Sequence, residues 1–158
     1  MRGSPFKVNN VKSFIKKYME HTKKISLVAA RFSPSITDNM VKSAIDEAKK
    51  YSAEVVRVVR VAGSYEMPLA MKKVISKGDS EAVVALAYIE RGETLHGEIM
   101  GHIVHGELVK MSLEHNIPLG IGIIGPGATM EQAIPRWDSY ARAAVRAALA
   151  LCDDLLFE

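Results

Sequence analysis

Cysteine is almost absent from the 158-residue sequence, which contains only Cys152. A single cysteine cannot form a disulfide within the chain, so a disulfide-rich secreted scaffold is excluded and the reducing cytoplasm is the expected compartment. Cys152 lies in an apolar segment with the pattern of a closing helix, and this setting does not indicate an activated thiol.

The sequence also lacks long apolar runs and a dominant charge. No run approaches the roughly 18 to 20 residues that a membrane span requires, and the segment from Met1 to Asn10 lacks the apolar centre of a secretion signal. The 21 Lys and Arg residues only slightly outnumber the 18 Asp and Glu residues, and they are spread along the chain. We therefore expect no membrane or nucleic-acid partner, whereas a small anionic ligand fits the net charge of +3.

Hydrophobic residues make up 48% of the chain, which is enough for one domain with its own core. We predict a single domain over residues 24–158, preceded by an extension over residues 1–23. Apolar side chains recur in this extension at helical spacing, at Val11, Phe14, Ile15, Tyr18 and Met19. Because lysines occupy the opposite side, the spacing predicts an amphipathic N-terminal helix.

Apolar runs alternate with helical patterns along the rest of the chain. Strands are predicted at residues 24–32, 54–63, 81–89 and 117–127. Helices are predicted at residues 37–51, 65–78, 95–116, 128–134 and 138–156. Apolar strands that alternate with helices form parallel sheets covered on both faces. We therefore predict a three-layer α/β/α fold around a four-stranded parallel sheet with right-handed crossovers.

Two local features mark the ends of these elements. Thr37 or Asp38 is the expected N-cap of the helix over residues 37–51, because short side chains that carry oxygen cap helices. The sequence Gly125-Pro126-Gly127 is expected to form the turn that ends the last strand. In a parallel α/β sheet, ligands bind outside the carboxyl ends of the strands, so the four strand-to-helix junctions should meet at one rim.

The first two junctions offer an aromatic ring and a carboxylate to this rim. Phe32 follows the first strand, where packing in the core and stacking on a flat ligand are both compatible with its position. Glu66 begins the helix after the second strand, where it either accepts hydrogen bonds from a polyol or stabilises the positive end of the helix. Neither residue indicates a ligand by itself.

The third junction combines groups suited to a phosphate and to proton transfer. Gly92, Glu93 and Thr94 open a helix whose free N–H groups can hold an anion, although helix capping is the commoner explanation for such residues. His96 follows in the first turn of this helix. It is either a proton-transfer group or a surface histidine.

Four more basic residues have open roles. His102 and His105 are three positions apart, but no third ligand follows at a suitable spacing, so no metal site is predicted. Arg136 and Arg142 are either phosphate ligands or solvated charges.

Four motifs in this order carry a resemblance to a known family. They are ARF…IT at residues 30–37, VAGSYEMPLAMKK at 61–73, RGETLHGEI at 91–99 and GPGATMEQA at 125–133. Over roughly residues 25–151 the chain resembles the 6,7-dimethyl-8-ribityllumazine synthases, in a variant similar to archaeal members. The resemblance implies a flavodoxin-like fold and a transferase of riboflavin biosynthesis. Its reaction condenses 5-amino-6-(D-ribitylamino)uracil with 3,4-dihydroxy-2-butanone 4-phosphate, without a metal or an organic cofactor.

The resemblance also implies roles for the residues at the rim. Phe32 would stack on the pyrimidine ring, and His96 would shuttle protons. Arg136 would bind the phosphate, mainly in the site of a neighbouring subunit, and Arg142 would replace the lysine that is usual in the last helix. The other substrate-binding residues that it implies are Ser64, Tyr65, Glu66, Ile89, Glu90, Gly92, Glu93, Thr94 and Ile121.

The same resemblance implies a homopentamer, which in some members assembles further into icosahedral shells. Two departures leave the larger assembly open: an N-terminal helix stands in place of the usual extended segment, and Pro135 precedes Arg136. The alternatives to catalysis are a shell-forming or flavin-binding paralogue without activity, and a paralogue that resembles riboflavin synthase.

Overall fold

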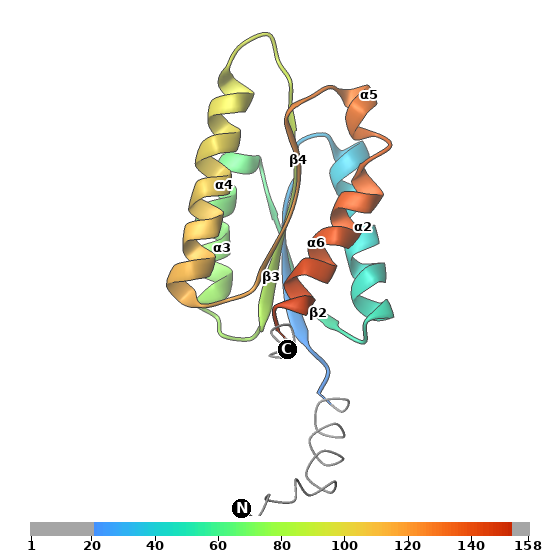
Figure 1. The fold of residues 1–158 in the computed structure, drawn as a ribbon, viewed down its shortest axis with the longest axis vertical. Coiled ribbons are helices and arrows are strands. Elements are labelled where there is room, and N and C mark those ends of the chain that lie inside the picture. Colours follow the sequence, from blue (N-terminus) through green and yellow to red (C-terminus); the bar gives the residue numbers. More distant parts are fainter. Residues whose placement is uncertain (1–20, 153–158) are drawn as a thin grey trace, which may run out of the picture.

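The computed structural model describes residues 21–152, which form a parallel sheet with helices on both faces (Figure 1). The strands are β1 (Lys24–Ala30), β2 (Glu54–Val61), β3 (Ala82–Glu90) and β4 (Leu119–Ala128). The helices are α2 (Pro34–Lys50), the 3-10 helix η1 (Ser64–Glu66), α3 (Met67–Ile75), α4 (His96–His115), α5 (Met130–Ala133) and α6 (Trp137–Ala150). The helix predicted for the N-terminal extension falls mainly on residues 1–20, outside the described range.

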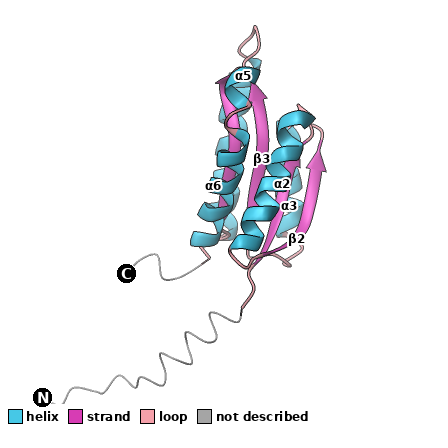
Figure 2. Ribbon diagram, turned by 90° about the vertical axis from the view of Figure 1, so that its right-hand side faces the viewer, coloured by secondary structure: helices cyan, strands magenta, loops and turns pink. Residues whose placement is uncertain are grey.

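The sheet has four strands in the order β2-β1-β3-β4, and every neighbouring pair is parallel. Helices α3 and α4 cover one face of the sheet, and α2 and α6 cover the other (Figure 1, Figure 2). This arrangement confirms the predicted three-layer α/β/α fold with a four-stranded parallel sheet. Because β1 and β3 are adjacent in the centre, the loops that follow them are neighbours at the carboxyl edge.

Alternate residues of the central strands enter the cores on opposite faces of the sheet. In β1, Leu27 and Ala29 belong to the core beneath α2 and α6, whereas Val28 belongs to the core beneath α3 and α4. β3 is buried along its length except at Glu90. This burial on two sides explains why the strands are continuous apolar runs. Among residues 21–152, no helix is apolar over a length sufficient to cross a lipid bilayer.

Helix α2 begins earlier than the sequence predicted. Its first residue is Pro34 and its N-cap is Ser33, which has a left-handed backbone with φ 52°. The prediction of Thr37 or Asp38 as the cap is therefore wrong. Proline favours the first helical position because its φ is already helical and it has no N–H to leave unpaired. Thr37 is instead buried in the first turn, and Asp38 forms an ion pair with Arg60 at 2.7 Å.

The segment Gly125-Pro126-Gly127 is part of β4 rather than a turn, so that prediction is wrong as well. The pairing with β3 shifts register there and resumes where Glu90 faces Ala128. A side chain at Gly125 would place its Cβ 2.1 Å from the carbonyl oxygen of Ile89, so only glycine fits this close approach. β4 is an edge strand, which tolerates proline, and the irregularity keeps the chain beside β3 to the end of the sheet.

A buried carboxylate joins α2 to α6. The Glu47 side chain is 2% exposed, and its two oxygens accept hydrogen bonds from Arg142 at 3.0 Å and Arg146 at 2.6 Å. Burial alone would raise the pKa of Glu47, but the hydrogen bonds from Arg146 and Arg142 outweigh it and hold the pKa below its ordinary value. Asp138 accepts hydrogen bonds from Ser43 and Arg142, which lower its pKa as well.

Replacement of Glu47 by Gln should lower the free energy of unfolding at neutral pH by about 1–3 kcal/mol, because both arginines lose a charged acceptor. The pKa of Glu47 is lower in the folded protein than its value in the unfolded chain, about 4.5. The carboxylate therefore stabilises the fold fully above this unfolded-state pKa, and the stabilisation is lost as the pH falls through the folded-state pKa. Urea unfolding at a series of pH values should therefore show the two proteins converging below about pH 4.5.

The matched control is Asp46→Asn, at the neighbouring exposed position of α2. This variant should differ little from the wild type at any pH. A stability difference for Glu47→Gln that stayed constant down to acid pH would contradict the assigned role of the Glu47 charge.

Candidate active site

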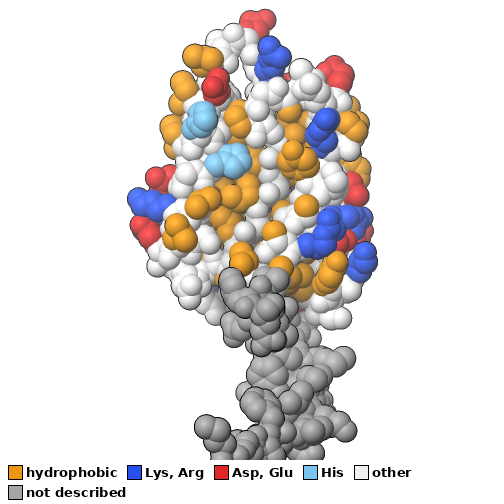
Figure 3. All heavy atoms as spheres, in the orientation of Figure 1, with side chains coloured by type: hydrophobic (Ala, Val, Ile, Leu, Met, Phe, Trp, Pro, Cys, Tyr) orange, Lys and Arg blue, Asp and Glu red, His pale blue; other side chains and the backbone are white. Residues whose placement is uncertain are grey.

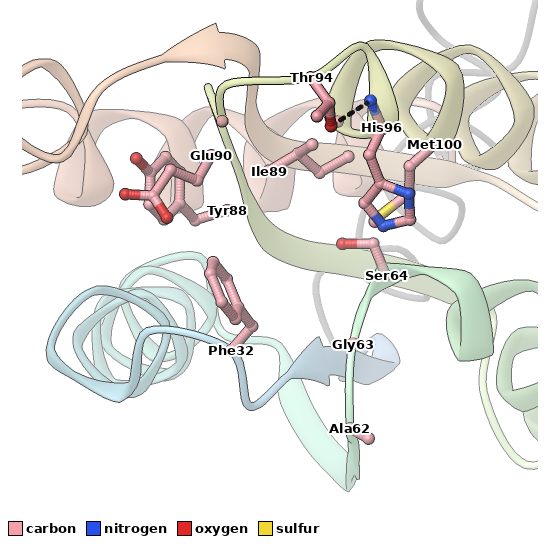
Figure 4. A pocket seen from close by; sticks show the side chains of 12 residues that line it. Phe32, Ala62, Gly63, Ser64, Tyr88, Ile89, Glu90, Thr94, His96 and Met100 are labelled. Atoms are coloured by element: carbon pink, nitrogen blue, oxygen red, sulfur yellow. Dashed lines mark hydrogen bonds between the residues drawn. The ribbon is translucent and has the colours of Figure 1, made fainter.

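A cavity of about 360 Å³ opens at the carboxyl edge of the sheet, between the ends of β1, β2 and β3 and the start of α4 (Figure 4). Its lining residues are Phe32, Ala62, Gly63, Ser64, Tyr88, Ile89, Glu90, Gly92, Thr94, His96, Gly97 and Met100. A second cavity of about 390 Å³ shares four of these residues, continues along the loop to Glu98 and is bordered by Gly127 from β4. All four junctions therefore contribute to this rim.

Phe32 lies at the mouth of the first cavity, with 47% of its surface exposed. Its ring is 6.2 Å from the ring of Tyr88, between centroids, at an interplanar angle of 32°. Tyr88 is buried, and its hydroxyl donates to the carbonyl oxygen of Ala128 at 3.0 Å. Burial raises the pKa of Tyr88, and the charges of Glu90 and Glu131 add to this effect, so the hydroxyl stays a donor. Phe32 thus offers an exposed aromatic face, and it packs against the Tyr88 ring, which is held in place by its hydrogen bond.

The residues after β2 divide between this cavity and a neighbouring groove. Ser64 is buried and lines the cavity. Tyr65 and Glu66 line the groove between β2 and α3 instead. One carboxylate oxygen of Glu66 accepts a hydrogen bond from the backbone N–H of Gly63 at 2.8 Å, which fixes the start of η1. The Tyr65 ring contacts the His96 ring edge-on, with centroids 5.8 Å apart.

The loop after β3 and the start of α4 form the polar side of both cavities. Residues 91–95 are exposed, and the N-cap of α4 is Leu95, which has no side chain able to accept a hydrogen bond. Thr94 accepts only a long hydrogen bond, 3.4 Å from the N–H of His96. The following N–H groups of the first turn have no partner within the helix and are available to an anion.

Besides Tyr65 and Glu66, three more of the predicted site residues line neither cavity within this chain. Ile121 lies on β4 and packs against the core beneath α3 and α4. Arg136 is exposed beyond the end of α5, where its guanidinium donates to the carbonyl of Gln132. Arg142 is held by Glu47 and Asp138 on the α2 side of the sheet. Within residues 21–152, Arg91 is therefore the only arginine that lines either cavity.

The site predicted from the sequence does not include five residues that line the first cavity: Ala62, Gly63, Tyr88, Gly97 and Met100. Tyr88 was assigned to the strand alone, although a hydroxyl-bearing ring at the end of an aliphatic run is a usable signal. Met100 lies one turn after His96 and therefore on the same helix face. No sequence pattern indicates Gly97, because this position matters through its close approach to the backbone of β3. A Cβ at Gly97 would lie 2.6 Å from the carbonyl oxygen of Glu90.

The other histidines of α4 have ordinary surroundings. The Nδ1 atom of His105 is 2.8 Å from the carbonyl oxygen of Gly101, and His102 is 3.9 Å from Glu98. Within the described residues, no three His, Cys, Asp or Glu side chains gather closely enough to hold a metal ion.

The comparisons with known proteins agree with this geometry. The sequence profile of the 6,7-dimethyl-8-ribityllumazine synthase family matches residues 22–155. A protein of that name from Saccharolobus islandicus is 42% identical over 132 residues, which span 84% of this chain and 86% of the relative. A protein of the same name from Metallosphaera sedula is 42% identical over 128 residues, 81% of this chain and 85% of the relative.

A more distant similarity has the same extent. The 6,7-dimethyl-8-ribityllumazine synthase of Pyrobaculum arsenaticum is 37% identical over 128 residues, again 81% of this chain and 85% of the relative. The family profile covers the sheet and the rim described above. The chain belongs to the 6,7-dimethyl-8-ribityllumazine synthase family.

Proposed function

We propose that the chain condenses 5-amino-6-(D-ribitylamino)uracil with 3,4-dihydroxy-2-butanone 4-phosphate to 6,7-dimethyl-8-ribityllumazine, with loss of phosphate and two waters. The observation that carries this proposal is the meeting of Phe32, His96 and the loop over residues 91–95 at one rim. These groups suit a flat ring, a proton-transfer step and a phosphate, and the family name gives a ribityllumazine as the product.

The pyrimidine partner fits the first cavity. Phe32 and Ser64 line this cavity, and we propose that they offer a face for stacking and a polar group. We propose that the backbone at Tyr65, the next residue after Ser64, offers a further polar group. Glu66 still has one carboxylate oxygen to accept from a ribityl hydroxyl, because only the other one accepts from Gly63. Ile89 and Glu90 border the same space.

The phosphate partner fits the second cavity. Gly92, Glu93 and Thr94 line it beside the first turn of α4, where free N–H groups and the positive helix end favour an anion. His96 lines the first cavity, and its neighbours Thr94 and Gly97 line both. We propose that its imidazole exchanges protons with substrates held in both cavities.

The chemistry needs orientation and proton transfer. The amine adds to the ketone and water leaves, phosphate is then eliminated, and ring closure releases the second water. Each step moves a proton, so a histidine between the partners is useful, and neither a metal nor a redox cofactor is required. We propose that the reaction takes place in the cytoplasm, as the near absence of cysteine suggests.

We also propose that residues 24–158 act as one domain and that the chain works as a homo-oligomer, specifically a pentamer. Large apolar side chains are exposed on α4, at Leu95, Ile99, Ile103 and Leu113. Figure 3 shows hydrophobic side chains gathered on the face between α4 and α6, where the β4 edge lies. The sheet has two different edges, β2 and β4, and a repeated contact between two different surfaces forms a ring when its rotation closes.

A neighbouring subunit in such a ring would supply what the single chain lacks. Arg136 is the arginine that we propose for the phosphate, with Ile121 and Arg142 as further contributions across the interface. Their absence from the cavities of their own chain supports a site completed by another copy. Decamers and icosahedral shells are larger assemblies of the same pentamer.

Mixing the purified protein with both substrates should form lumazine faster than the uncatalysed reaction, as followed by absorbance. His96→Ala should slow this reaction at least several-fold, up to about 100-fold, because a proton-transfer group is lost. The matched control is His115→Ala, at the exposed far end of the same helix, which should leave the rate unchanged.

Three outcomes would contradict the proposal. A rate equal to background, with lumazine still bound, would indicate a paralogue that binds the product without making it. Riboflavin formed from lumazine alone would indicate an enzyme like riboflavin synthase. Equal rates for His96→Ala and the wild type would remove His96 from the mechanism.

A further inference from the structure

We propose that the ring of Tyr65 is a positioning group for His96, which rests on the proposed function of His96 in proton transfer. The two residues come from different junctions: Tyr65 lies in η1 after β2, and His96 is the first residue of α4 after β3. Their ring centroids are 5.8 Å apart at an interplanar angle of 67°. This edge-to-face geometry is the favoured arrangement of two aromatic rings.

The His96 imidazole lacks the usual means of orientation. A histidine that transfers protons is commonly fixed by a hydrogen bond from one ring nitrogen to a carboxylate or a carbonyl. In the part of the chain that the structure describes, the only hydrogen bond of His96 outside the helix joins its backbone N–H to Thr94. Neither ring nitrogen has a partner there, so packing must set the direction of the ring.

The backbone of His96 is fixed more firmly than its side chain. Gly97 brings the first turn of α4 so close to the end of β3 that a Cβ there would lie 2.6 Å from the carbonyl oxygen of Glu90. The Cα of His96 therefore has a set position beside the cavity. The His96 side chain can still rotate about its own bonds. The Tyr65 ring packs against one side of the imidazole and limits this rotation.

Tyr65 contacts His96 from outside the first cavity. Its side chain lines the neighbouring groove with Leu69 and Val61 and is not among the residues that line the cavity. Its hydroxyl has no hydrogen bond within the described residues, so the ring itself makes the contact. Figure 4 shows the His96 ring directed towards Ser64, the residue before Tyr65, and away from the α4 axis.

The choice of substitutions follows from this contact. Tyr65→Phe keeps the ring and should retain nearly full activity. Tyr65→Leu keeps an apolar side chain without the ring and should lower kcat about two- to tenfold with little change in KM, the size expected for one aromatic contact. The backbone at Tyr65, which we propose to face the pyrimidine, is unchanged in both variants.

A double-mutant cycle separates positioning from direct substrate contact. In a His96→Ala background, Tyr65→Leu should have no further effect on kcat, because the group that it orients is gone. The same loss in both backgrounds would overturn the proposal, as would an unchanged kcat in Tyr65→Leu or an equal loss in Tyr65→Phe. If Tyr65→Leu does not fold, Tyr65→Met serves as the ringless variant.

A spectroscopic readout keeps the test independent of the reaction. The NMR signals of the His96 ring should shift in Tyr65→Leu and stay close to wild type in Tyr65→Phe, because the neighbouring ring is lost only in the first. His115 is the internal control and should not shift in either variant. Unchanged His96 signals in Tyr65→Leu would overturn the positioning role of Tyr65, even if the protein makes lumazine. Shifted His96 signals in a protein that makes no lumazine would contradict only the proposed function.

Discussion

Gly120→Ala should destabilise the fold by about 3 kcal/mol or more, a large effect for the addition of one methyl group. A Cβ at Gly120 would lie 2.0 Å from the carbonyl oxygen of Ala144 and 2.7 Å from its carbonyl carbon. Both atoms belong to the backbone of α6, so no side-chain rotation relieves the overlap. The helix would have to move away from β4 and open the core between them. Urea unfolding gives the loss as a lower midpoint.

Small residues on both elements allow this close packing. Gly122 lies two positions further along β4, and a Cβ there would be 2.8 Å from Leu86 and 3.1 Å from the Cβ of Ala144. The facing residues of α6 include the buried Ala141 and Ala148. The contact is therefore continuous, and a change at its centre disturbs the whole helix.

The matched control is Gly106→Ala, in the interior of α4. Within its own chain, a Cβ at Gly106 meets nothing within 4 Å. Alanine favours a helix interior over glycine by up to about 1 kcal/mol, so this variant should be as stable as the wild type or slightly more stable. Equal unfolding midpoints for Gly120→Ala and Gly106→Ala would contradict the packing described for α6.

Hydrophobic patterns predicted the sheet because each strand is buried by two layers. β3 carries an unbroken apolar run, and such runs alternate with helical patterns only in a parallel α/β fold. The ends of elements were less predictable because two local preferences compete there. At α2, the preference of Pro34 for the first helical position prevails over capping by Thr37. At β4, pairing between Glu90 and Ala128 prevails over the turn preference of glycine and proline.

The candidate site was predictable where it follows from chain order. Phe32, Ser64 and His96 each belong to the junction between a strand and the helix that follows it, so a parallel sheet must bring them to one edge. Contacts between distant residues left no pattern in the sequence. Arg142 is bound to Glu47 across a separation of 95 residues, and the ring contact of Tyr65 with His96 also joins two different junctions.

The double substitution of Ile103 and Leu113 by Glu should convert the proposed oligomer into monomers. These residues lie with Leu95 and Ile99 on one stripe of α4, and 50% and 78% of their surfaces are exposed in the single chain. The opposite side of α4 already covers the core through Val104 and Leu108. A helix that is apolar on both sides is normally buried on both, so the stripe needs a second copy to cover it. Sedimentation velocity measures the change.

Loss of assembly should also lower kcat/KM for lumazine formation by about 100-fold or more, because Arg136 of another copy would no longer reach the phosphate. Lys49→Glu on the exposed surface of α2 changes the net charge equally and is the matched control, with assembly and activity unaffected. The monomer should still unfold in one cooperative transition, at a lower urea concentration than the wild type, because assembly stabilises the folded subunit by mass action. A stable monomer with full activity would mean that one chain contains the complete site, and Arg136 would then have no role in it.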